Sequence, residues 1–123
     1  MKFEMPSYKE DGSKGDPLVI HVTDDREILF TSHYSDIEPL EVDVIDLEAL
    51  LVATRTNVAV SVVGYSGDRI LRMQKFEKEE AILTSFWIKI SIDDTLYIVS
   101  SHVVREVLTA VIEIRRKVEY SMI

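Results

Sequence analysis

The chain of 123 residues contains no cysteine. This absence excludes disulfides, thiolate metal ligands and a cysteine nucleophile, and it suits a reducing compartment. No run approaches the roughly 18 apolar residues that a membrane span needs. Residues 1–10 also lack the apolar segment typical of a secretory signal. We therefore expect a cytoplasmic protein.

Basic residues are scarce in the first part of the chain. Residues 1–48 hold thirteen Asp and Glu against four Lys and Arg, whereas residues 49–123 hold nine against ten. The densest stretch, residues 36–48, has six acids and no base. A one-sided negative field repels nucleic acid and anionic lipid and attracts basic surfaces. We therefore expect neither nucleic acid nor a membrane as a partner.

The overall composition is that of a globular protein. Apolar residues make up 46% of the chain and charged residues 29%, which argues against disorder. The length is typical of one domain. Residues 9–17 hold two Gly, one Pro and several charges, as a loop does. We expect residues 1–17 to form a flexible tail or an edge segment, and residues 18–123 to form a single domain.

Hydrophobic periodicity predicts an α+β fold. Two-residue alternation indicates strands, and apolar residues spaced three and four apart indicate helices. The expected elements are a hairpin of 19–22 and 28–34, a helix at 44–54, strands at 58–63, 69–76, 82–92 and 95–100, and a helix at 103–119. This order, ββ-α-ββββ-α, predicts an antiparallel sheet of five to six strands with two helices packed on one face. Asp43 or Asp46 is expected to cap the first helix.

Few residues suggest catalysis or metal binding. The histidines, His21, His33 and His102, have neither helical i,i+4 spacing nor another paired-ligand motif. Residues 64–67 contain two glycines but lack the Lys-Ser/Thr ending of a phosphate loop. We therefore expect no metal, no cofactor and no enzymatic activity.

Two features indicate a partner-binding surface. The first is the acidic segment, with Asp36, Glu38, Glu41, Asp43, Asp46 and Glu48. The second is the sheet face opposite the isoleucines of residues 82–92, which we expect to carry Tyr65, Phe76, Trp87 and Tyr97, together with Val99. Aromatic residues are enriched at interface centres. The alternatives are that the acids are simply solvated or paired locally, and that the first hairpin or the N-terminal segment covers the aromatic face.

In size, charge and expected architecture the chain resembles small acidic proteins that bind other proteins, such as immunity proteins, antitoxins, inhibitors and chaperones. The leading hypothesis is an inhibitor of a basic protein, for example a nuclease toxin, steered by charge. One alternative is a homodimeric structural or adaptor module that uses the aromatic face. Another is a small-molecule-binding domain with a pocket between the sheet and the helices.

Overall fold

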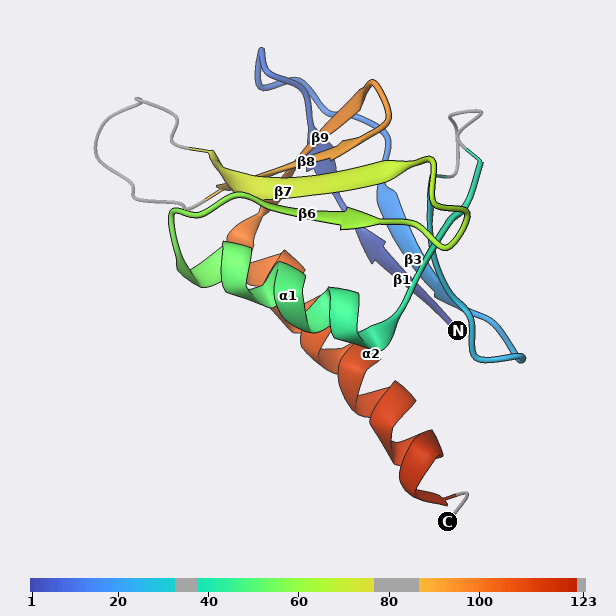
Figure 1. The fold of residues 1–123 in the computed structure, drawn as a ribbon. Helices are drawn as coiled ribbons and strands as arrows, with labels where there is room; N and C mark the ends of the chain where they lie inside the picture. Colours follow the sequence, from blue (N-terminus) through green and yellow to red (C-terminus); the bar gives the residue numbers. More distant parts are fainter. Residues whose placement is uncertain (33–37, 77–86, 122–123) are drawn as a thin grey trace.

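The computed structural model describes residues 1–32, 38–76 and 87–121, the last four by backbone alone. The elements are β1 (Lys2–Met5), β2 (Ser7–Tyr8), β3 (Leu18–Val22), β4 (Ile28–Ser32), β5 (Leu40–Val42), α1 (Val44–Arg55), β6 (Val60–Val63), β7 (Ile70–Phe76), β8 (Trp87–Ile92), β9 (Thr95–Ser100) and α2 (Ser101–Ser121). The strands form two antiparallel sheets, in the orders β1-β3-β4-β5 and β2-β9-β8-β7-β6 (Figure 1). The predicted α+β class and the four-stranded meander from β6 to β9 are confirmed.

The second sheet is the main difference from the prediction of a single sheet. β1 pairs with β3, and β5 pairs with β4, so that the first hairpin becomes the centre of its own sheet. The chain passes from one sheet to the other at Pro6, between β1 and β2. Residues 1–17 therefore contribute an edge strand to each sheet. The three strands that the sequence did not predict have only two to four residues each, too few to show an alternating pattern.

The helices lie beneath the five-stranded sheet in the view of Figure 1. α1 contacts β6 and β7, whereas α2 contacts β8, β9 and also β1 of the other sheet. Because α2 touches both sheets, the prediction of two helices on one face of a single sheet is not confirmed in that form. The core between these elements is apolar, with Phe30, Leu47, Leu50, Leu71, Ile88, Ile90, Val104 and Leu108 among its fully buried residues.

The register of β9 corrects one prediction. Ile92 pairs with Thr95 across the turn Asp93-Asp94, so Ile90 faces Tyr97 and Ile88 faces Val99. Side chains at directly paired positions lie on the same face of a sheet. Tyr97 and Val99 therefore belong to the isoleucine face and are buried, with Tyr97 only 3% exposed. The prediction that Tyr97 lies on the outer face beside Trp87 is wrong.

Candidate functional site

The middle of the acidic segment has a structural role at the start of α1. The Asp43 carboxylate accepts a hydrogen bond from the Val44 N–H at 2.6 Å, and Asp46 accepts one from the Asp43 N–H at 3.0 Å. Together with the bond from the Asp46 N–H to the Asp43 cap they form a capping box, which satisfies amide groups that a helix start leaves unpaired. The predicted cap at Asp43 is confirmed.

The end of the acidic segment is held by the second helix. The Glu48 carboxylate accepts a hydrogen bond from the Arg116 guanidinium, which joins α1 to α2. Asp46 and Glu48 are both half-buried. These two predicted partner-binding residues thus have partners inside the chain, as the alternative of local pairing supposed.

The start of the segment lies against the turn that joins β6 to β7. The Arg69 guanidinium donates to the backbone carbonyls of Glu38 and Pro39, at 2.8 and 3.1 Å. Two residues further on, the Glu41 carbonyl accepts a hydrogen bond from the Tyr65 N–H at 2.9 Å. This last bond connects β5, at the edge of the four-stranded sheet, to Tyr65, just beyond the end of β6 at the edge of the five-stranded sheet. It also brings Tyr65 beside the acidic segment. Asp36 lies outside the described residues.

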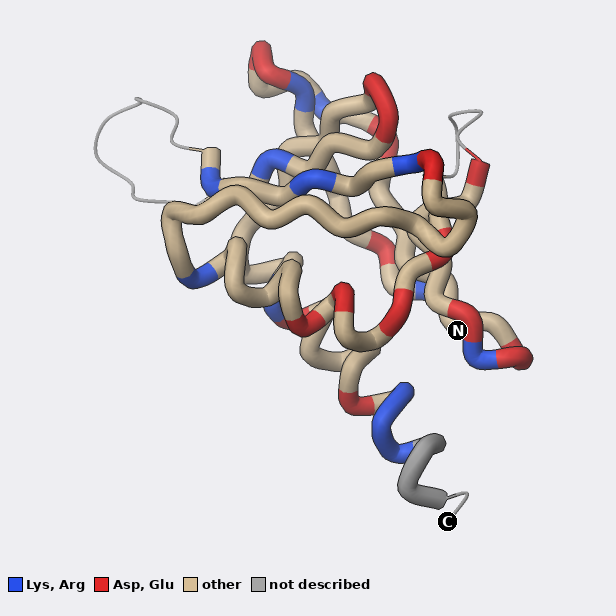
Figure 2. The backbone as a smooth tube through the Cα atoms, in the orientation of Figure 1, with Lys and Arg blue, Asp and Glu red and all other residues tan. Residues whose placement is uncertain are grey.

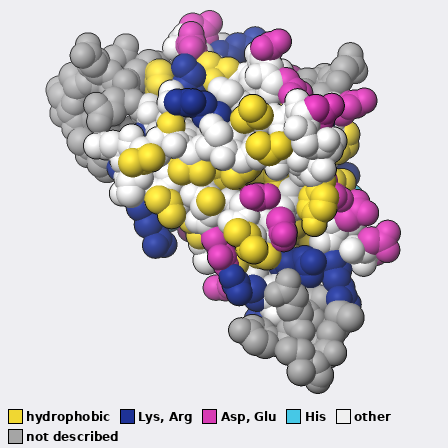
Figure 3. All heavy atoms as spheres, in the orientation of Figure 1, with side chains coloured by type: hydrophobic (Ala, Val, Ile, Leu, Met, Phe, Trp, Pro, Cys, Tyr) yellow, Lys and Arg dark blue, Asp and Glu magenta, His cyan; other side chains and the backbone are white. Residues whose placement is uncertain are grey.

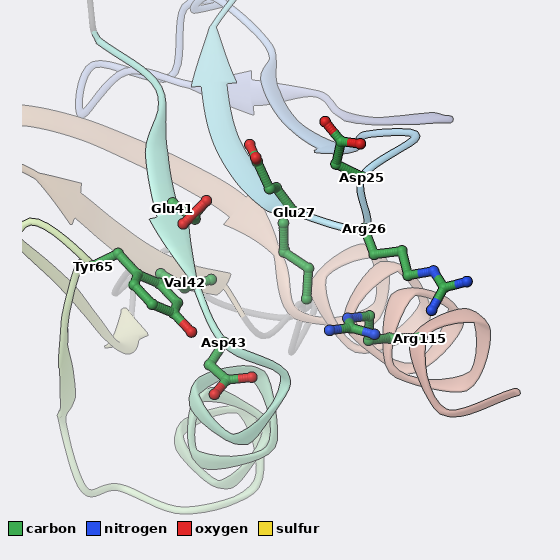
Figure 4. Close-up of a pocket in the computed structure, with 9 residues that line it drawn as sticks. Asp25, Arg26, Glu27, Glu41, Val42, Asp43, Tyr65 and Arg115 are labelled. Carbon is green, nitrogen blue, oxygen red and sulfur yellow. The ribbon is translucent and has the colours of Figure 1, made fainter. Parts of the chain in front are cut away.

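A cleft opens where these elements meet, and its walls are mainly charged. Its lining residues are Asp25, Arg26, Glu27, Ile28, Glu41, Val42, Asp43, Tyr65 and Arg115. We call it the acidic cleft. Figure 4 shows the Tyr65 ring extending toward Asp43, while Arg26 and Arg115 lie together on the opposite side. The volume is about 140 Å³, below the roughly 300 Å³ at which small-molecule pockets begin. This size disfavours a small-molecule ligand in the acidic cleft itself.

The charge of the acidic cleft comes from two distant parts of the chain. Asp25 and Glu27 flank Arg26 between β3 and β4, whereas Glu41 and Asp43 belong to the acidic segment. From the sequence, residues 23–27 were placed only as the connection of the first hairpin, between 19–22 and 28–34, and no function was assigned to them. Their density of acids was a signal, but their position opposite β5 follows only from the pairing of β4 with β5. In Figure 2 the red residues gather around this part of the molecule.

An apolar surface adjoins the acidic cleft. Tyr65 is 71% exposed, and Val63 and Ile70, which face each other across β6 and β7, are 53% and 54% exposed. We call these three residues the Tyr65 platform. Figure 3 shows hydrophobic side chains over the face made by β6, β7 and α1, with acidic side chains among and beside them. The structure therefore brings predicted aromatic and acidic residues, Tyr65 with Glu41 and Asp43, into one place.

Two other predicted aromatic residues lie elsewhere. Phe76 and Trp87 face each other at the far ends of β7 and β8 from the Tyr65 platform, and both are half-buried. The Tyr8 ring of β2 meets the Trp87 ring edge-on, with centroids 5.4 Å apart. The N-terminal segment thus covers part of this aromatic face, as the alternative supposed.

The described residues contain no group of three or more His, Asp or Glu side chains that could hold a metal ion. His21 lies in β3, and His102 contacts Glu106 one turn along α2, with Nε2 and Oε1 2.9 Å apart. Over their described residues, neither α1 nor α2 is long and apolar enough to cross a membrane. Comparison of the chain with family models, curated proteins and solved structures gives no match.

Proposed function

We propose that this chain is a protein-binding protein whose partner presents a basic surface around an apolar centre. One observation carries the proposal: an exposed tyrosine lies between two exposed aliphatic residues and a group of carboxylates. Tyrosine is enriched among the residues that dominate binding energy, and such residues are surrounded by contacts that exclude water. The Tyr65 platform would supply the anchor and the acidic cleft part of its charged border.

Charge favours a basic partner. Four carboxylates line the acidic cleft against two arginines, and the whole chain carries a net charge of −8. Such a field repels nucleic acid and accelerates encounter with positive surfaces. A protein that itself binds nucleic acid, such as a nuclease, presents a surface of this kind. By covering that surface the chain would act as an inhibitor.

The experiment is affinity capture with matched baits. The wild-type chain, Tyr65→Ala and the double variant Glu27→Gln/Glu41→Gln are immobilised in parallel at about 50 mM and about 500 mM salt, where screening differs strongly. The control baits are Thr109→Ala and Glu106→Gln/Glu113→Gln, all at exposed residues of α2.

The expected result is a basic protein that is retained by the wild type and by both control baits. It should be lost from Tyr65→Ala. It should also be weakened in Glu27→Gln/Glu41→Gln relative to the wild type, most clearly at low salt, where the removed charges would be screened least. A captured protein that stays bound to Tyr65→Ala does not use the Tyr65 platform and contradicts the proposal. Recovery of a second copy of the chain alone would favour the homodimeric module.

A further inference from the structure

Among the strands that the structure describes, three of the four sheet edges carry features that discourage further strand pairing. β1 holds the charged residues Lys2 and Glu4 and is followed by Pro6. β2 has only two residues, and Tyr8 makes a further bridge to Lys14. β5 has three residues, and the Glu41 carbonyl is bonded to Tyr65. Short length, charge, proline and covering loops are the usual means by which proteins protect sheet edges.

The fourth edge, β6, carries neither a charge nor a proline. It reads Val-Ser-Val-Val and follows Val58 and Ala59, so residues 58–63 contain neither a charge nor a proline. Ser61 and Val63 are exposed. Arg72, which pairs with Ser61, belongs to the neighbouring strand β7 and not to the edge itself. An apolar edge of this kind is a template for another strand.

The hydrogen-bond pattern shows which backbone groups point outward. The Gly64 N–H donates to the Arg69 carbonyl at 2.9 Å, so the alternating positions Val62 and Val60 bond to β7 in the same way. The N–H and C=O groups of Ser61 and Val63 therefore point away from β7. Among the described residues, no backbone group bonds to them from outside the sheet. An unpaired row of this kind is what an added strand requires.

The same outward row leads to the acidic cleft. Tyr65 is the next residue of this alternation after Val63, and its N–H is the one bonded to Glu41. A strand that lies along Ser61 and Val63 would therefore have one terminus beside Glu41 and the Tyr65 ring. Its terminal side chains would meet the carboxylates of the cleft, which favour positive charge.

We propose that β6 accepts an extended segment of the partner as an additional antiparallel strand, and that Lys or Arg residues preceding this strand enter the acidic cleft. The inference rests on the proposed function, because it describes how a basic partner uses the same surface. Every described strand pair in both sheets is antiparallel, and we assign the added strand the same direction. β6 runs toward Tyr65, so the added strand begins at the cleft, and its basic residues precede its apolar ones. A second copy of the chain is disfavoured because each copy carries a net charge of −8.

The test uses a fluorescein-labelled synthetic peptide of three arginines followed by alternating valine and threonine. Binding is measured by fluorescence anisotropy with the wild-type chain, Ser61→Pro and Ser61→Ala. Proline removes the outward N–H and leaves the β6–β7 hydrogen bonds in place, because Ser61 does not donate to β7. Alanine keeps that N–H. Ser61→Pro should weaken binding by about tenfold or more, and Ser61→Ala by less than about twofold.

Two further measurements use the wild-type chain, so that the test does not depend on whether Ser61→Pro folds correctly. The first uses two N-methylated peptides, with methyl groups on alternate backbone amides, against the wild-type chain. In a paired strand only one of the two sets of amides faces β6, so one peptide should lose binding and the other should keep it. The second is sedimentation of the chain alone, which should show a monomer. A dimer that Ser61→Pro dissociates would assign the edge to a second copy and overturn the inference.

Wild-type binding too weak to detect at about 1 mM peptide, or equal loss with both methylated peptides, would also overturn it. Failure here is distinguishable from failure of the proposed function. If the partner is captured by Ser61→Pro but lost from Tyr65→Ala, the docking surface is correct and strand addition is wrong. If Tyr65→Ala has no effect on capture, the docking surface itself is wrong.

Discussion

Arg69 and Asp93 join the turn before β7 to the turn between β8 and β9. The Arg69 Nη2 and Nε atoms lie 2.8 and 3.1 Å from one Asp93 carboxylate oxygen. The hydrogen bond to Asp93 raises the pKa of Arg69, which favours the charged guanidinium. The same guanidinium donates to the carbonyls of Glu38 and Pro39. One side chain, 16% exposed, therefore fixes the acidic segment beside the Tyr65 platform.

Arg69→Met should lower the free energy of unfolding by about 1–3 kcal/mol. The reason is that Asp93 and two backbone carbonyls lose a charged donor together, and hydrogen bonds to charged groups contribute more than neutral ones. Urea denaturation gives the change. The control is Arg72→Met on the exposed face of β7, which should stay within about 0.5 kcal/mol of the wild type. Equal effects of the two substitutions would show that Arg69 does not hold the turns together.

Asp43→Ala should destabilise the protein by about 0.5–2 kcal/mol through loss of the α1 cap. It removes the acceptor for the Val44 N–H and breaks the capping box with Asp46. Thermal unfolding followed by circular dichroism measures the loss. Asp25→Ala is the matched control, because Asp25 is an exposed acid of the same cleft and caps no helix. If both variants melt alike, the capping box has no energetic role.

The roles of these acids show how much of the site could be predicted from the sequence. The cap was predictable because its two acids are three residues apart, and local spacing alone defines a capping box. The partnership of Glu48 with Arg116 was not, since it depends on how two helices that are distant in the chain pack together. The same holds for Asp25 and Glu27, which reach the cleft only through the pairing of β4 with β5. Residue types indicated an acidic surface, but tertiary pairing decided which acids form it.

For the strands, the face of β8 was predictable from the sequence, whereas the face of Tyr97 in β9 was predicted wrongly. Alternation along residues 82–92 predicted a row of one face that includes Ile88, Ile90 and Ile92, and these three residues are buried in β8. Residues 82–86 of the predicted strand lie outside the described residues. The face of Tyr97 was predicted wrongly because it depends on how many residues the preceding turn contains. A two-residue loop at Asp93-Asp94, with Asp93 at a φ of 53°, sets Tyr97 opposite Ile90. The length of this turn, read with the isoleucine row, was sufficient to place Tyr97 in the core.

Trp87, the one tryptophan of the chain, should report whether β2 is docked. In Tyr8→Ala the indole loses the ring that meets it edge-on, so its fluorescence should shift to longer wavelength. The matched control Tyr65→Ala, at the opposite end of the sheet, should leave the emission unchanged. A double-mutant cycle with Tyr8→Ala and Trp87→Leu should give a coupling of about 0.5–1.5 kcal/mol. An unchanged emission in Tyr8→Ala would mean that β2 does not cover Trp87 in solution.

The turn of the Tyr65 platform should keep its negative charge in unusually acidic solution. The Ser66 hydroxyl donates to the Asp68 carboxylate at 2.6 Å, and this hydrogen bond lowers the pKa of Asp68. Because the folded pKa lies below the unfolded value of about 3.9, the stabilisation from this bond is present above that value. It is lost as the pH falls through the lower, folded pKa. An NMR titration of the carboxyl carbons measures this directly.

Ser66→Ala should move the pKa of Asp68 upward, toward its ordinary value. Asp11 provides the internal control. Its pKa is lowered in the same way by Ser13, whose hydroxyl donates to the carboxylate at 2.6 Å. Its titration should be unchanged in Ser66→Ala and should shift upward only in Ser13→Ala. If Asp68 titrates identically with and without the Ser66 hydroxyl, the turn is not held by this bond. The charge beside Tyr65 would then fall with pH as that of any exposed aspartate does.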